Sequence, residues 1–248
     1  MALLGMILAA VLVAVLLAYL IVKFLPLNLR WIVSILLLVL TIFLGYKIYD
    51  GIMKPINFNK AKKVKFAKVI ESLKIIRDAE IKYYEATGTY AKDKSALIKF
   101  IDTAQLALTE TKTVVVQVNK GTRYAPIMVD EEKRVTDTTG YEPVIKYFEN
   151  RDYKNMFKVP GVEGKEFDLE TASVEKVQGL EVPTFQAKVE KKLILEGMDN
   201  SLVKQELERV ETDEIKGEYI SVGSLSEVST NGNWPPFYDK IDRANKDN

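Results

Sequence analysis

The stretch that decides the fold runs from Ala2 to Tyr49 and reads ALLGMILAAVLVAVLLAYLIVKFLPLNLRWIVSILLLVLTIFLGYKIY. Two basic residues and a Pro-Leu-Asn-Leu turn divide it into two apolar runs. About 20 apolar residues in a helix cross a bilayer core of roughly 30 Å, and a helix satisfies its own backbone groups in lipid. The sequence therefore predicts a transmembrane hairpin over residues 1–53, with its two spans joined by a short connector at residues 26–30.

The charges that flank the two spans indicate an orientation. Lys23 and Arg30 lie between the spans, whereas several lysines follow the second span closely. The positive-inside rule then places both termini, and the soluble domain, in the cytoplasm. A domain of about 200 residues can be translocated regardless of its charge, so a periplasmic domain is the alternative. Either way, the prediction is a two-pass protein of the bacterial inner membrane.

A basic segment follows the predicted hairpin. Residues 54–94 carry 11 basic and 5 acidic side chains, and the more distal part of the chain is acidic. Basic residues beside a membrane commonly meet lipid headgroups. Nucleic acid is not an expected partner, because aromatic residues do not alternate with the basic ones. The residues predicted to lie at the membrane surface are Lys54, Lys60, Lys62, Lys63, Lys65 and Lys68.

The chain has no cysteine and no histidine. This composition excludes disulfides, thiol nucleophiles, Cys/His metal sites and imidazole acid–base catalysis. Carboxylates cluster at residues 130–132, at Glu206, Glu208 and Glu211, and at residues 213–214. We interpret these clusters as solvated charged faces. The sequence therefore predicts no catalytic residue, no metal site and no cofactor.

The second segment, residues 54–110, is predicted to be an amphipathic helical stalk. Lys54-Pro55 favours a bend, because the residue before proline avoids the α region. Beyond it, apolar residues recur at spacings of three, four and seven as far as Tyr83 and Tyr84. Gly88 is expected to end this helix. A second helix is predicted from Ser95 to Leu108.

The third segment, residues 111–228, is predicted to be an α+β soluble domain in which the helix over residues 66–86 packs on an antiparallel sheet. Its expected strands include residues 114–118, 192–195 and 219–222, because their residues are β-branched or apolar. The polar interval at residues 130–140 is expected to be a loop. Asp199 is expected to begin the last helix.

The fourth segment, residues 229–248, is predicted to be an extended tail. It contains an aromatic, proline-flanked sequence that can dock in the groove of a partner protein. The same sequence can equally pack back on its own domain, and both readings stay open at this point. The residues concerned are Trp234, Pro235, Pro236, Phe237 and Tyr238.

Residues 73–100 read LKIIRDAEIKYYEATGTYAKDKSALIKF. This segment resembles the junction in type IV pilins and in the pseudopilins of type II secretion, where a long N-terminal helix leads into a Gly-x-Tyr sequence. The chain differs from pilins in its two predicted spans, in lacking a prepilin cleavage signal, and in having no glutamate in the first span. The resemblance implies later strands packed against the helix.

The chain also resembles a group of membrane-anchored proteins of Bacteroidota that have no assigned activity. The shared features are Lys54-Pro55-Ile56 and three later segments, at residues 182–188, 222–225 and 231–234. Together these patterns predict a non-enzymatic structural or adaptor component of a multi-protein envelope assembly, of the secretion or motility type. Its expected partners are membrane lipid and other membrane or envelope proteins. A pilin-like subunit that assembles into a homo-oligomer is the alternative, and a membrane-tethered hydrolase is a remote one.

Overall fold

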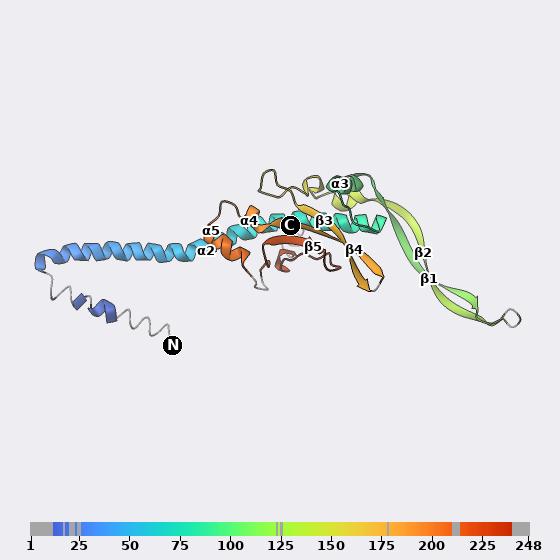
Figure 1. The fold of residues 1–248 in the computed structure, drawn as a ribbon, viewed down its shortest axis with the longest axis horizontal. Coiled ribbons are helices and arrows are strands. Elements are labelled where there is room, and N and C mark those ends of the chain that lie inside the picture. Colours follow the sequence, from blue (N-terminus) through green and yellow to red (C-terminus); the bar gives the residue numbers. More distant parts are fainter. Residues whose placement is uncertain are drawn as a thin grey trace. The chain divides into compact units, whose positions relative to one another are not determined.

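The computed structural model describes residues 12–16, 18–19, 23, 26–122, 124, 126–177, 179–209 and 214–239. The chain forms two compact units, Met1–Asn59 and Lys60–Asn248 (Figure 1). The helices are α2 (Leu27–Thr87), α3 (Lys94–Thr103), η1 (Val144–Phe148), η2 (Tyr153–Asn155), α4 (Lys191–Ile194) and α5 (Asn200–Leu207). The strands are β1 (Gln105–Asn119), β2 (Met128–Pro143), β3 (Asp168–Val177), β4 (Leu180–Glu190) and β5 (Tyr219–Gly223).

The first unit contains an apolar helical segment long enough to cross a membrane. This segment belongs to the helix that runs from Leu29, and its most apolar window has a mean hydropathy of 2.2 with none of its residues buried. Exposed apolar side chains over such a length need a non-aqueous neighbour. It is the one candidate span within the described residues. The other predicted span falls mostly outside them, so the transmembrane hairpin is not confirmed.

Helix α2 does not stop at the predicted bend. Pro55 lies inside it, and the helix continues to Thr87. Proline removes one backbone hydrogen bond, the one to the carbonyl of residue 51. Alanine and lysines, which favour helix, follow a few residues later and continue the ladder. Gly88 ends the helix as predicted, with a φ of 77° and its N–H donated to the carbonyl of Tyr84 at 2.8 Å.

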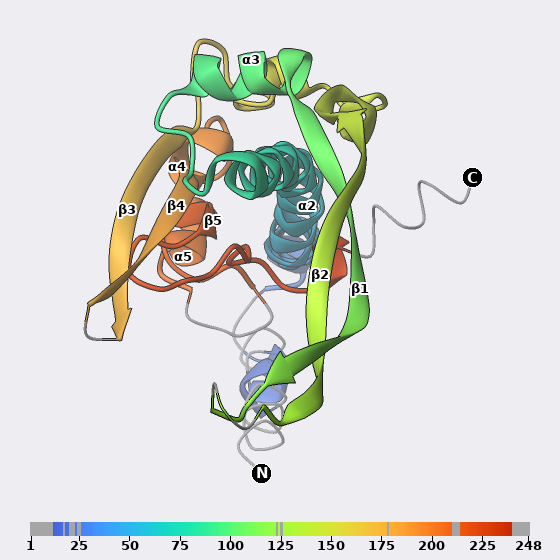
Figure 2. The same ribbon diagram turned by 90° about the vertical axis from the view of Figure 1, so that its right-hand side faces the viewer.

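The core of the second unit is built around α2. The predicted apolar stripe is confirmed as far as Ile76, but Tyr83 is only half-buried and Tyr84 is exposed. The confirmed members are at most 1% exposed; they are Phe66, Val69, Ile70, Leu73 and Ile76. Strands β3, β4 and β5 form an antiparallel sheet in that order. Figure 2 shows this sheet on one side of α2 with α3 crossing beyond, and Figure 1 shows the β1–β2 pair extending past the end of α2. The buried side chains of the sheet are Thr184, Phe185, Ala187, Val189, Ile220 and Val222.

Three local predictions are wrong. The polar interval 130–140 is not a loop but part of β2, which pairs with β1 over its whole length. Residues 105–108 belong to β1 rather than to a helix, so the expected border at 110/111 falls inside a strand. Residues 192–195 are not a strand: α4 covers 191–194, because the buried Lys191 side chain and the turn that follows fix the local backbone.

The α+β class is confirmed, with one long apolar N-terminal helix and antiparallel sheets. The pilin-like packing of helix on sheet is not confirmed. The last predicted helix does begin at Asp199. The carboxylate of Asp199 accepts hydrogen bonds from the N–H groups of Ser201 (3.0 Å) and Leu202 (3.2 Å), which satisfies free donors of the first turn.

Candidate functional site

The most exposed feature of the second unit is the two-stranded ribbon formed by β1 and β2. It projects from the region of α3 and η1, well beyond the end of the rest of the unit (Figure 1). Of its described side chains only Leu106 is buried. Near its turn Tyr124 is 97% exposed. The ribbon therefore adds almost nothing to the core.

The two strands of this ribbon differ in chemistry. From Thr113 to Val118, β1 is uncharged and rich in valine, and Val115 is 63% exposed. The paired part of β2, residues 130–134, is charged at every position. Val115 lies directly opposite Glu132, so the two side chains share a face. The ribbon thus has one neutral edge and one charged edge.

A buried ion cluster lies at the other end of the unit. The ammonium of Lys62 on α2 is 2.8 Å from Glu206 of α5 and 3.0 Å from Glu214. Lys62 and Glu206 are at most 1% exposed. Lys191 is equally buried, lies 3.6 Å from Glu206, and donates to the carbonyls of Ile215 and Glu206. The cluster joins α2 to the region of α4 and α5, more than 100 residues later in the sequence.

The titration of two groups reflects this burial. Burial lowers the pKa of the Lys191 ammonium, and the Glu206 carboxylate opposes that shift. Burial, together with the charges of Glu214 and Glu206, raises the pKa of the Tyr238 hydroxyl. The described residues offer no hydrogen-bond partner to this hydroxyl or to Oε1 of Glu206. Because breaking a buried ion pair leaves an uncompensated charge, we interpret the cluster as a structural connection.

The predicted membrane-surface lysines do not behave alike. Lys54 is 2.6 Å from Asp50, one helical turn away. Lys65 is half-buried and donates to the carbonyl of Ile194 at 2.8 Å. Lys62 is wholly buried in the ion cluster, so its predicted placement at a lipid surface is wrong. Its ammonium instead forms ion pairs with Glu206 and Glu214. The exposed members of the set are Lys54, Lys60, Lys63 and Lys68.

The aromatic tail segment packs on α2 of its own unit. Trp234 and Tyr238 are 8% and 2% exposed. The Lys74 ammonium donates to the Tyr238 carbonyl at 3.0 Å and lies 3.1 Å from Asp239. Pro235, Pro236 and Phe237 keep part of their surface exposed, and the Phe237 ring lies below the Lys63 ammonium at 5.4 Å. Only these three could contact a partner without rearrangement.

Glu80 is an acidic group in the core. It is fully buried on α2, and its Oε2 accepts the N–H of Ala91 at 2.9 Å. Its other carboxylate oxygen, also buried, has no hydrogen-bond partner among the described residues. Burial raises its pKa to about 7. Glu80 fixes the turn that leads from α2 to α3.

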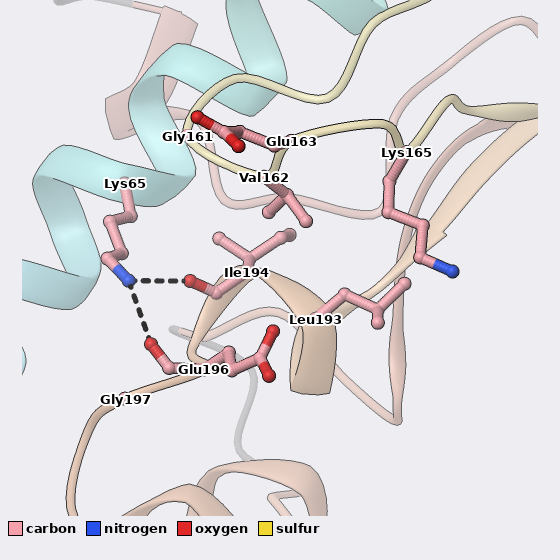
Figure 3. A pocket seen from close by; sticks show the side chains of 9 residues that line it. All are labelled: Lys65, Gly161, Val162, Glu163, Lys165, Leu193, Ile194, Glu196 and Gly197. Carbon is pink, nitrogen blue, oxygen red and sulfur yellow. Dashed lines mark hydrogen bonds between the residues drawn. The ribbon is translucent and has the colours of Figure 1, made fainter.

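A shallow pocket of about 390 Å³ lies between the turn at residues 161–165 and the end of α4. Figure 3 shows the Lys65 ammonium directed at the carbonyls of Ile194 and Glu196, at 2.8 and 3.4 Å. The lining of the pocket contains two lysines and two glutamates, so its charges balance. The Lys65 charge therefore serves to hold the 194–196 turn on α2, and the pocket favours neither anion nor cation.

Sequence reasoning missed the ion cluster. The carboxylates of Glu206 and Glu214 were expected on solvated faces, and this is wrong for both, since Glu214 is only 18% exposed and Glu206 is buried. The available signal was small: Glu206 lies on the same face of α5 as the apolar Val203, three residues earlier. No metal-binding group of acidic residues occurs in the described part of the chain.

No protein-family model, curated protein sequence or solved structure matches this chain.

Proposed function

We propose that the chain is a membrane-anchored adaptor, a structural component that holds a partner protein within a multi-protein envelope assembly rather than an enzyme. The observation that carries this proposal is the projecting β1–β2 ribbon. It takes up strands of 15 and 16 residues, of whose described side chains one is buried. A two-stranded ribbon alone is marginally stable in water. A contact with another protein would stabilise it.

The apolar segment of α2 supplies the anchor in this proposal. The lysines that follow it favour a cytoplasmic soluble unit by the positive-inside rule, with a second span over residues 2–22. In that arrangement Lys60, Lys63 and Lys68, which are exposed, contact anionic headgroups. An impermeant maleimide tests the arrangement in intact cells, because the chain has no cysteine. Labelling of Asn28→Cys without labelling of Asp130→Cys supports it, and the reverse pattern places the unit outside the cytoplasm.

Photo-cross-linking from the ribbon tests the adaptor role. A photoreactive residue replaces Tyr124, near the exposed tip, and the matched control replaces Tyr219 on β5, which is 39% exposed. In the membranes of the expressing cells, an adaptor yields adducts with foreign chains at the tip and not at the control. Adducts with the same chain alone instead support the second candidate, a self-assembling subunit, which the neutral edge of β1 favours. The absence of any tip-specific adduct refutes both.

A further inference from the structure

We infer that the outer edge of β1 pairs with the same edge of a second copy of this chain, antiparallel, with Val115 of each copy on the two-fold axis. This pairing is independent of any foreign partner that the ribbon holds. It makes a continuous four-stranded sheet in the order β2-β1-β1-β2 and places two ribbon tips in one assembly.

The outer edges of β1 and β2 differ in how they are protected. Among the described residues each ribbon strand pairs only with the other, so β1 and β2 each have one unpaired edge. Proteins usually block such edges with charges, prolines or bulges. β2 has five consecutive charged residues, 130–134. β1 has none from Thr113 to Val118, and the one register shift of the ribbon lies earlier, at Leu108/Thr109. The β1 edge is therefore the unprotected one.

The two-fold symmetry of such a pair also favours β1. In a two-fold antiparallel pair of identical strands, the residue on the axis lies opposite its own copy. If the axis passes through any of residues 130–134 of β2, a charge meets the same charge, which is destabilising. On β1 the residue at the axis can be a valine, and β-branched pairs are favourable across strands. Symmetry thus excludes the charged part of β2 and allows β1.

The charged residues on either side of the valines fix the register. With Val115 on the axis, Glu110 of one copy lies opposite Lys120 of the other, and Lys112 lies opposite Val118. With the axis moved one residue to Val116, Lys112 lies opposite Lys120, and two ammonium groups face each other. Opposite charges across strands stabilise and like charges destabilise. Charge complementarity therefore selects Val115.

The contact is small. The eleven paired residues, 110–120, extend over about 36 Å in a single pair of strands, and stable interfaces between soluble proteins bury about 1,200 Å² or more. Such an edge contact is sufficient only where the copies are already concentrated, as they are when held in one membrane. The test accordingly uses the full chain in the membranes of the expressing cells.

Single cysteines across the ribbon measure the pairing directly, because the chain has none of its own. Residues directly opposite in an antiparallel pair are close enough for a disulfide. We expect oxidation to cross-link Val115→Cys most strongly, with a steep fall at Thr113→Cys and Gln117→Cys. Those two variants should instead cross-link to each other when co-expressed. Glu132→Cys, directly opposite Val115 on β2, is the matched control and should stay monomeric.

A charge on the axis provides the second measurement. The dimer is measured by chemical cross-linking with a reagent that does not react with amines, so that the added lysine does not change the reactivity. Val115→Lys should abolish this dimer, whereas Val115→Thr, which is neutral and β-branched, should retain it. Both replace an exposed side chain, and the introduced lysine faces Glu132 within its own ribbon, so the ribbon itself tolerates it. Thr136→Lys adds the same charge to β2 and should leave the dimer intact. A cross-linking maximum at another position or on β2, no cross-link at Val115→Cys, or a dimer unchanged by Val115→Lys overturns the inference.

Discussion

Replacing Glu80 with glutamine should change how the stability of the second unit depends on pH. The carboxyl is buried, and its pKa is raised to about 7 from an ordinary value of 4.5. Below pH 4.5 the group is protonated in both the folded and unfolded states and contributes no pH dependence. Between pH 4.5 and 7 the unfolded chain releases the proton while the folded chain retains it, so the folded state loses stability as pH rises.

The size of this effect follows from the shift. The two pKa values differ by 2.5 units, and each unit corresponds to 1.36 kcal/mol, so ionised Glu80 costs about 3 kcal/mol above pH 7. Glu80→Gln removes the charge and keeps an oxygen to accept the Ala91 N–H. The difference in unfolding free energy between the variant and the wild type should therefore shift by about 3 kcal/mol in favour of the variant between pH 4 and pH 8.5. Any fixed cost of the glutamine amide cancels from this comparison.

Denaturant unfolding of the full chain in mild detergent measures the difference. The chain has two tryptophans, and Trp31→Phe leaves the buried Trp234 as the fluorescent probe of the second unit. Glu71→Gln, exposed on the same helix, is the control and should differ from the wild type by less than about 0.5 kcal/mol at every pH. A Glu80→Gln difference that stays constant with pH, or that moves against the variant as pH rises, refutes the reasoning.

Two further changes test the packing of the second unit by the same unfolding measurement. Lys62→Ala should cost about 3 kcal/mol, because it removes the nearest cation from the buried Glu206 carboxylate and leaves only Lys191 and Arg209 beside it, whereas Lys68→Ala, at an exposed site, should cost less than about 0.5 kcal/mol. Gly223→Ala should destabilise the unit strongly, because φ is 75° and the new methyl group would overlap the carbonyl of Phe185. Gly140→Ala, with open space around it, is the control. Equal effects of the two substitutions would contradict the description of the β4–β5 edge.

The features that sequence predicted correctly are those with a local signal. The apolar spacing of α2 indicates the face that is buried, because a helix repeats every 3.6 residues. Gly88 ends this helix because its positive φ costs glycine nothing. Asp199 caps α5 because its carboxylate reaches the next two N–H groups. Each of these signals lies within a few residues of the element that it determines.

The features that sequence missed have no local signal. Strand β2 shows no alternation of apolar and polar residues, because neither of its faces covers a core. Its pairing with β1 decides its structure, and that pairing is visible only in the fold. The ion cluster is hidden for a related reason: Lys62 and Glu206 are 144 residues apart, and each alone resembles an ordinary surface charge.

The distance between Lys62 and its partner has a consequence for synthesis. The chain is made from its N-terminus, so the apolar face of α2 leaves the ribosome long before the strands that accompany it. Glu206 follows Lys62 by 144 residues, and Tyr238, whose backbone carbonyl accepts from Lys74, follows Lys74 by 164 residues. Contacts so distant in sequence form late. A nascent chain that stalls before Trp234 therefore leaves uncovered the part of α2 around Lys74 on which the tail packs. Surface exposed in this way in an incomplete chain is prone to aggregation and is the kind that chaperones bind.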